Sequence, residues 1–97
     1  MRPYAWVMIG LTLVVGGCKE RVDRAQCDQL LARFAELVVK EKMPNADPTT
    51  IRAEQGRERD EAASDDNFKN CTTELRAAEY RCAMVARTSE ALLKCLE

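Results

Sequence analysis

The stretch 24-RAQCDQLLARFAELVVKEK-42 decides the fold, because its apolar residues recur at the spacing of a single helical face. Successive members of this stripe are 3, 1, 3, 3 and 1 residues apart: Cys27, Leu30, Leu31, Phe34, Leu37 and Val38. Such spacing is typical of an amphipathic helix. The sequence Met43-Pro44-Asn45 follows and ends the pattern. We therefore predict a helix over residues 24–42.

A second stripe lies nearer the C-terminus. Its members are 3, 4, 3, 4 and 3 residues apart: Phe68, Cys71, Leu75, Ala78, Cys82 and Val85. This seam predicts one helix over residues 66–86, packed against an antiparallel neighbour. The candidate N-caps are Ser64, Asp65 and Asp66. Two further capping residues, Thr88 and Ser89, predict a last short helix over 89–97.

The segment between these stripes is highly charged, and Ile51 is its only large apolar residue between positions 49 and 67. Asp47-Pro48 has the form of an N-cap followed by proline in the first helical turn. We expect an exposed helix over residues 48–63, with a flexible linker as the alternative. The resulting fold class is all-α, a small bundle or hairpin of three or four helices in one domain, residues 24–97.

The N-terminal segment has a different character. After Arg2 the chain carries no charge until Lys19. The apolar stretch 3–17 would be about 22 Å long as a helix, whereas the hydrocarbon core of a bilayer is about 30 Å thick. The segment is therefore short for a membrane span and has the layout of a secretory signal peptide.

This segment ends in Val15-Gly16-Gly17-Cys18, which resembles the lipobox of bacterial lipoproteins. The resemblance covers only the leader and Cys18. It implies cleavage after residues 1–17, diacylglycerol on the Cys18 sulfur, in many bacteria a third acyl chain such as palmitate, and a lipidated tether over 18–23. The alternatives are an ordinary secretory signal with an incidental cysteine and an uncleaved anchor. An aspartate after the cysteine tends to retain such lipoproteins at the inner membrane, so Lys19 favours the outer membrane. It does not determine whether the domain lies on the periplasmic or the surface-exposed face of that membrane.

Four cysteines remain besides Cys18: Cys27, Cys71, Cys82 and Cys95. Small exported domains have thin cores and commonly need covalent links. An even number of cysteines in such a chain predicts two disulfides. Reduction should therefore loosen or unfold the domain.

Helical geometry narrows the pairing of these cysteines. On one predicted helix, Cys71 and Cys82 would lie about 16 Å apart, whereas a disulfide requires Cα atoms within about 7 Å. Residues equidistant from the turn of a helical hairpin face one another. Cys82 and Cys95 are symmetric about the Thr88-Ser89 turn, and Cys27 and Cys71 about the connection 43–50. We favour Cys27 with Cys71 and Cys82 with Cys95, and Cys27 with Cys82 plus Cys71 with Cys95 is the alternative.

Composition argues against several functional classes. Without residues 1–17 the net charge is −2, so the sequence lacks the strongly basic character typical of nucleic-acid-binding domains. Histidine is absent, and the carboxylates lie mostly among mixed charges, so we expect no enzyme. The cysteines have neither the close pairs of a zinc ribbon nor a Cys-x-x-Cys motif, so we expect no metal and no cofactor. The aromatic side chains outside the leader are expected in the core: Phe34, Phe68 and Tyr80.

The combined features predict a lipid-anchored, non-enzymatic helical module of the cell envelope that binds or positions another envelope protein. One alternative is a small inhibitor or immunity-type protein directed against an envelope-active enzyme or toxin. Another is a purely structural lipoprotein. We expect a monomer held to the membrane by its N-terminal lipid, although a dimer that shares the second stripe is also compatible with the sequence.

Overall fold

The computed structural model describes residues 21–97, so the leader and the lipobox with Cys18 lie outside the described residues. The described part of the chain contains five helices: α1 (Arg24–Lys42), α2 (Pro48–Ala63), α3 (Cys71–Glu74), α4 (Ala77–Met84) and α5 (Ser89–Cys95). The predicted all-α, disulfide-linked fold is confirmed, with five helices among residues 21–97 where three or four were expected.

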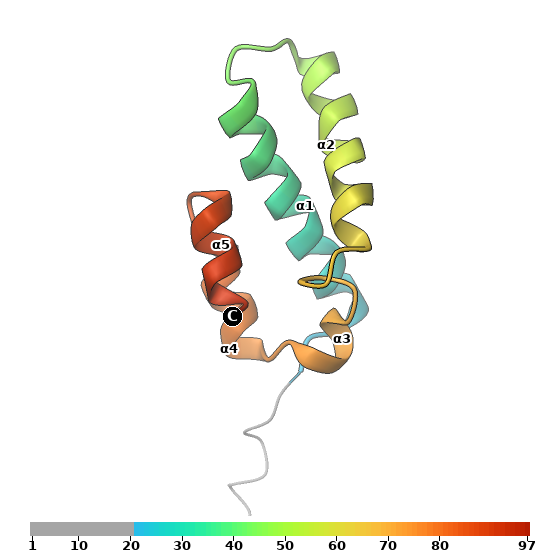
Figure 1. Cartoon of the computed structure of the whole chain (residues 1–97), viewed down its shortest axis with the longest axis vertical. Helices are drawn as coiled ribbons and strands as arrows, with labels where there is room; N and C mark the ends of the chain where they lie inside the picture. Colours follow the sequence, from blue (N-terminus) through green and yellow to red (C-terminus); the bar gives the residue numbers. More distant parts are fainter. Residues whose placement is uncertain (1–20) are drawn as a thin grey trace, which may run out of the picture.

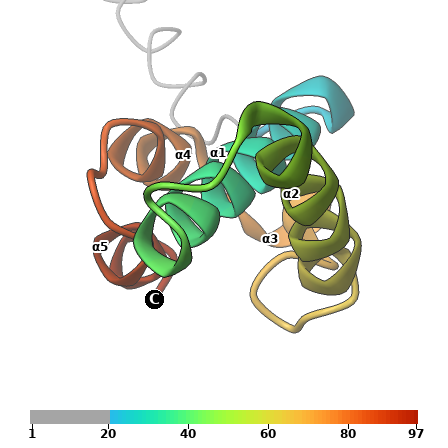
Figure 2. The ribbon, with the colours of Figure 1, turned by 90° about the horizontal axis from the view of Figure 1, so that it is seen from above.

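Helix α1 is the centre of the fold. It runs antiparallel to α2, and the short α4–α5 hairpin covers another side of it (Figures 1 and 2). A capping box begins α1, because the Asp23 carboxylate accepts from the Gln26 N–H at 2.8 Å and the Gln26 side chain accepts from the Asp23 N–H at 3.0 Å. The helix ends at Lys42, directly before the Met43-Pro44-Asn45 sequence that predicted its end.

Helix α2 confirms the helical interpretation of the charged middle segment. Its N-cap is Asp47, whose carboxylate accepts from the Thr50 N–H at 2.9 Å, and Pro48 occupies the first turn. Ala62 is the only residue of this helix that is buried. Because few of its side chains are buried, local helical interactions and charged surface contacts add to its packing along α1 in stabilising α2.

The continuous helix predicted over residues 66–86 is wrong, because the structure has two short helices with a break between them. Leu75 ends α3 in an extended conformation, with ψ 135°, which turns its side chain into the core at 6% exposure. Arg76 is also extended, and it forms an isolated antiparallel bridge with Arg21. The Glu79 side chain then accepts from the Arg76 N–H at 2.9 Å as α4 begins. Burial of Leu75 and this bridge therefore compete with helical continuity.

The ends of this predicted helix also differ from expectation. Residues 64–70 form turns, so the expected N-caps Ser64, Asp65 and Asp66 start no helix, and Ser64 instead ends α2. Val85, at the other end of the stripe, is 76% exposed. The periodic spacing therefore did not describe one buried face.

The last helix begins as predicted. The Thr88 hydroxyl accepts from the Ala91 N–H at 3.0 Å and so provides the N-cap of α5. The helix ends at Cys95, two residues before the predicted end. Leu92, in its middle, is fully buried.

The core lies along the inner face of α1, where the side chains of the other helices meet it. Its largest fully buried members are Leu30, Val39 and Leu92. Phe34 of α1 and Phe68 of the 64–70 turn are in contact, with ring centroids 5.0 Å apart. Two polar contacts join α4 and its C-terminal flank to α1. The Tyr80 hydroxyl donates to Gln29 at 2.7 Å, and Arg33 donates to the Ala86 carbonyl at 2.9 Å.

Candidate functional site

The cysteines pair as hairpin symmetry favoured. The Cys27–Cys71 disulfide joins the first turn of α1 to α3, with Cα atoms 6.0 Å apart and both residues buried. The Cys82–Cys95 disulfide joins α4 to the end of α5, with Cα atoms 5.7 Å apart. The alternative pairing is therefore wrong. All four sulfurs hold helices together.

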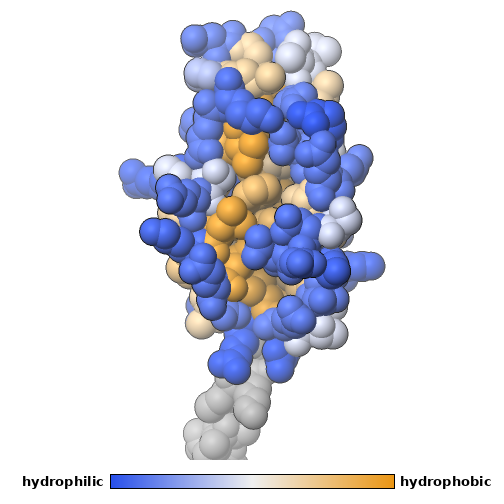
Figure 3. Space-filling model, in the orientation of Figure 1, coloured by the Kyte–Doolittle hydropathy of each residue, from blue (hydrophilic) through white to orange (hydrophobic). Residues whose placement is uncertain are grey.

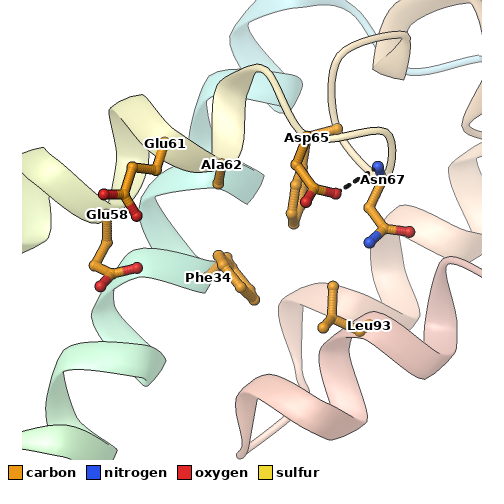
Figure 4. Close-up of a pocket in the computed structure, with 8 residues that line it drawn as sticks. Phe34, Glu58, Glu61, Ala62, Asp65, Asn67 and Leu93 are labelled. Carbon is orange, nitrogen blue, oxygen red and sulfur yellow. Dashed lines mark hydrogen bonds between the residues drawn. The ribbon is translucent and has the colours of Figure 1, made fainter.

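A groove lies between α2 and α5, with α1 as its floor. It is lined by Phe34, Glu58, Glu61, Ala62, Asp65, Asn67, Phe68 and Leu93 and has a volume of about 190 Å³. We call this surface the α2/α5 groove. Figure 3 shows hydrophobic surface along the molecule between hydrophilic flanks. In Figure 4, Phe34 of α1 and Leu93 of α5 border the same space.

The groove exists because α2 and α5 each pack against α1 without extensive contact with one another. Phe68 is buried beneath it, whereas Phe34 and Leu93 are only partly buried. The expectation that the aromatic side chains belong to the core therefore holds for Phe68 and is incomplete for Phe34 and Tyr80, which pack against the core but are only partly buried. The periodicity of α1 placed Phe34 on the inner face, but it carried no signal that two neighbouring helices would stand apart there.

Carboxylates border the groove on the α2 side. Glu58 pairs with Lys42 at 2.9 Å and with Arg57 at 3.3 Å, and Glu61 pairs with Arg57 at 2.7 Å. The hydrogen bond and charge of Glu58 raise the pKa of Lys42 above its ordinary value. Asp65 forms no ion pair with the described residues, and its carboxylate accepts from the Asn67 N–H at 2.9 Å.

Arg57 organises these side chains from the outer surface of α2. It also pairs with Glu54, and that hydrogen bond lowers the pKa of the Glu54 carboxyl. These i,i+3 and i,i+4 contacts support the helix. The sequence predicted an exposed helix for this charged stretch, and in the structure part of that helix forms one wall of a groove.

A second cavity, of about 250 Å³, adjoins the first and shares Asn67 with it. Its acidic lining residues are Asp66, Glu74 and Glu79, and its apolar ones are Leu75 and Leu96. Leu93 and Leu96 lie one turn apart along the chain, so the two cavities follow the same edge of α5. The acidic border therefore continues from α2 towards α3 and α4.

The described residues define what chemistry this part of the chain offers. Among residues 21–97, no three or more cysteine or carboxylate side chains form a group suited to a metal ion. The helices of this same part are too short or too polar for a membrane span. No known family, curated protein or solved structure matches the chain.

Proposed function

We propose that this chain is a lipid-anchored lipoprotein of the bacterial cell envelope, whose helical domain binds or positions another envelope protein without catalysis. The observation that carries the proposal is how soon the folded domain begins after the lipobox cysteine. The backbone of Arg21 forms an antiparallel bridge with the backbone of Arg76. The next residue, Val22, is already part of the core at 4% exposure. Arg21 is three positions after Cys18, so the two residues between them span about 10 Å at most.

Such a short tether keeps the domain at the membrane surface. The chain enters the domain beside the α3–α4 junction, at the end opposite the α1–α2 connection (Figure 1). Two or three acyl chains, each contributing about 0.8 kcal/mol per buried CH₂, suffice for stable anchoring. A small domain held in this way, linked by two disulfides and bearing a groove, is suited to contact a neighbouring protein. Lys19 supports delivery to the outer membrane.

Intact-mass spectrometry of the protein extracted from membranes tests the anchoring. The expected product begins at Cys18, carries diacylglycerol on that residue, and has no thiol that alkylation modifies without reduction. A Cys18→Ala variant, placed behind a leader that signal peptidase removes without lipidation, should be recovered from the soluble fraction. An unlipidated wild-type chain that begins at Cys18 or beyond would overturn the proposal.

Crosslinking in intact cells tests the binding role. The lipidated wild-type protein should form a reproducible crosslink with another envelope protein, and the soluble Cys18→Ala variant should form less of it. The partner's identity distinguishes a positioning role from an inhibitory one, because an inhibitor should crosslink to a hydrolase or toxin and lower its activity. Absence of any reproducible crosslink from every face of the domain would contradict the proposal.

A further inference from the structure

We infer that the α2/α5 groove is the docking site for a basic amphipathic helix of the partner protein. This inference rests on the proposed function, because it specifies the chemistry of the partner that the anchored domain contacts.

The shape of the groove suits a helix. Two helices form its walls and a third its floor, so a partner helix laid along α1 would complete a bundle. The cavity of about 190 Å³ is smaller than the roughly 300–1,000 Å³ of small-molecule sites. It has room for one or two apolar side chains of a helix against Phe34 and Leu93.

The charge of the groove suits a basic partner. Three carboxylates line its main cavity and three line the adjoining one, and no lysine or arginine among residues 21–97 lines either. Lys42 and Arg57 already pair with Glu58. Glu61 is paired with Arg57 on one side, but its side chain is 62% exposed. Asp65 is exposed and forms no ion pair with the described residues. These two carboxylates are therefore the best placed to receive lysine or arginine from a partner.

The same charge disfavours two other occupants. Two copies of this chain placed groove to groove would bring their carboxylates together, and like charges in contact repel. Anionic phospholipid headgroups would meet the same repulsion. A helix with an apolar stripe flanked by lysine or arginine satisfies both the apolar floor and the acidic border.

A binding experiment with defined peptides tests the inference on the mature lipidated protein in phosphatidylcholine nanodiscs. The probe is an amphipathic peptide of leucine and lysine, roughly 18 residues and five turns long. One control peptide has glutamate in place of every lysine, and another has the same composition with leucine spread around the helix. After subtraction of binding to empty nanodiscs, the amphipathic basic peptide should bind most tightly, and added salt should weaken it. Equal binding of the acidic peptide, or no binding of the basic one, would overturn the inference.

Matched variants locate the binding surface. The double variant Glu61→Gln/Asp65→Asn should weaken binding of the basic peptide about tenfold, since each exposed ionic contact contributes up to about 1 kcal/mol. The control Asp60→Asn/Glu90→Gln makes the same charge change outside the groove and should alter binding less than about twofold. Unchanged circular dichroism spectra and melting temperatures establish that both variants are folded. An equal loss in both variants would assign binding to net charge and overturn the inference.

Photocrosslinking in intact cells separates failure of this inference from failure of the proposed function. A photoreactive amino acid replaces Leu93 in the groove or, as the control position, the exposed Val85 outside it. The Leu93 probe should crosslink to a partner segment that is basic and amphipathic, and Glu61→Gln/Asp65→Asn should reduce that product. Partner crosslinks from Val85 alone would retain the proposed function and overturn the groove assignment. An acidic segment, or a second copy of this chain, at Leu93 would overturn the assignment of the occupant.

Discussion

The two disulfides link very different parts of the molecule. Cys27–Cys71 joins residues 44 positions apart, and both cysteines lie in the core, at 6% and 7% exposure. Cys82–Cys95 joins residues only 13 positions apart, and Cys82 is exposed. The first link closes a long loop through the centre of the fold, whereas the second clips one short hairpin at its surface.

This difference indicates that the two links support the groove in different ways. The buried link fixes α3 to the start of α1 and so holds the 64–70 turn, with Phe68, against the core. The exposed link keeps α5 beside α4 and so positions Leu93 on the opposite wall. Removal of the first should disturb the whole domain, and removal of the second mainly the α4–α5 hairpin.

The largest expected effect is that of Cys27→Ala/Cys71→Ala. Loop entropy for a separation of this length corresponds to about 4 kcal/mol, a large part of the roughly 5–15 kcal/mol that stabilises a small domain. Loss of buried sulfur contacts adds to this. Urea unfolding of the mature protein, followed by circular dichroism, should show a much lower midpoint or no cooperative transition. If this variant lowered the free energy of unfolding less than removal of the Cys82–Cys95 disulfide does, the proposed ranking of the two links would be contradicted.

Cys82→Ala/Cys95→Ala should lower the free energy of unfolding by less, about 3 kcal/mol, because the loop that this disulfide closes is shorter. This variant should keep a cooperative transition, and its α1–α2 hairpin should retain slow amide exchange. Limited reduction of the wild-type protein with alkylation is the companion measurement. Because thiol attack requires access, Cys82 and Cys95 should be modified before Cys27 and Cys71. Simultaneous modification of both pairs would show that exposure does not distinguish them.

Much of this framework was predictable from sequence, because local rules determine it. The periodicity of α1, the Asp47-Pro48 start of α2 and the Thr88 cap of α5 depend on residues within one or two turns. The disulfide pairing followed from hairpin symmetry. Cys71 and Cys82 nevertheless lie on separate helices, α3 and α4, so the single helix predicted to carry both was wrong.

The break at Leu75 and the groove were not predictable in the same way, because both depend on contacts between distant segments. The seam around Leu75 has an unbroken helical period, yet burial of Leu75 and the bridge between Arg21 and Arg76 favour an extended backbone there. The groove likewise depends on α2 and α5 standing apart over Phe34. The proposed lipidation of Cys18 rests on the lipobox alone.

Gly56→Ala tests how far local helix propensity stabilises α2. A Cβ atom at Gly56 would meet nothing within 4 Å, and alanine is favoured over glycine inside a helix. The free energy of unfolding should rise by about 0.5–1 kcal/mol. Ala53→Gly, at an exposed position of α2, should lower it by a similar amount. No change in either variant would mean that local helix propensity does not control the stability of α2.

The smallest expected effect concerns the polar contact that joins α5 to the C-terminal end of α1. Glu41 of α1 accepts from the Ser89 N–H at 2.8 Å and from its hydroxyl at 2.6 Å, and these hydrogen bonds lower the pKa of Glu41 below its ordinary value of 4.5. Ionised Glu41 therefore stabilises the folded state above that ordinary value, and the contribution disappears as pH falls through the lowered pKa.

Glu41→Gln should consequently lower the free energy of unfolding by roughly 0.5 kcal/mol near neutral pH, since solvent screens so exposed a contact. Urea unfolding at a series of pH values should show the gap between wild type and variant closing under acidic conditions, below the ordinary pKa of 4.5. Asp60→Asn, which removes an exposed charge from α2 and leaves the contacts between α1 and the α4–α5 hairpin in place, should leave the hairpin's amide exchange unchanged. If Glu41→Gln also leaves exchange in α5 unchanged, its contact with Ser89 does not hold the α4–α5 hairpin. The exposed disulfide, buried Leu92 and the Tyr80–Gln29 and Arg33–Ala86 hydrogen bonds then hold it.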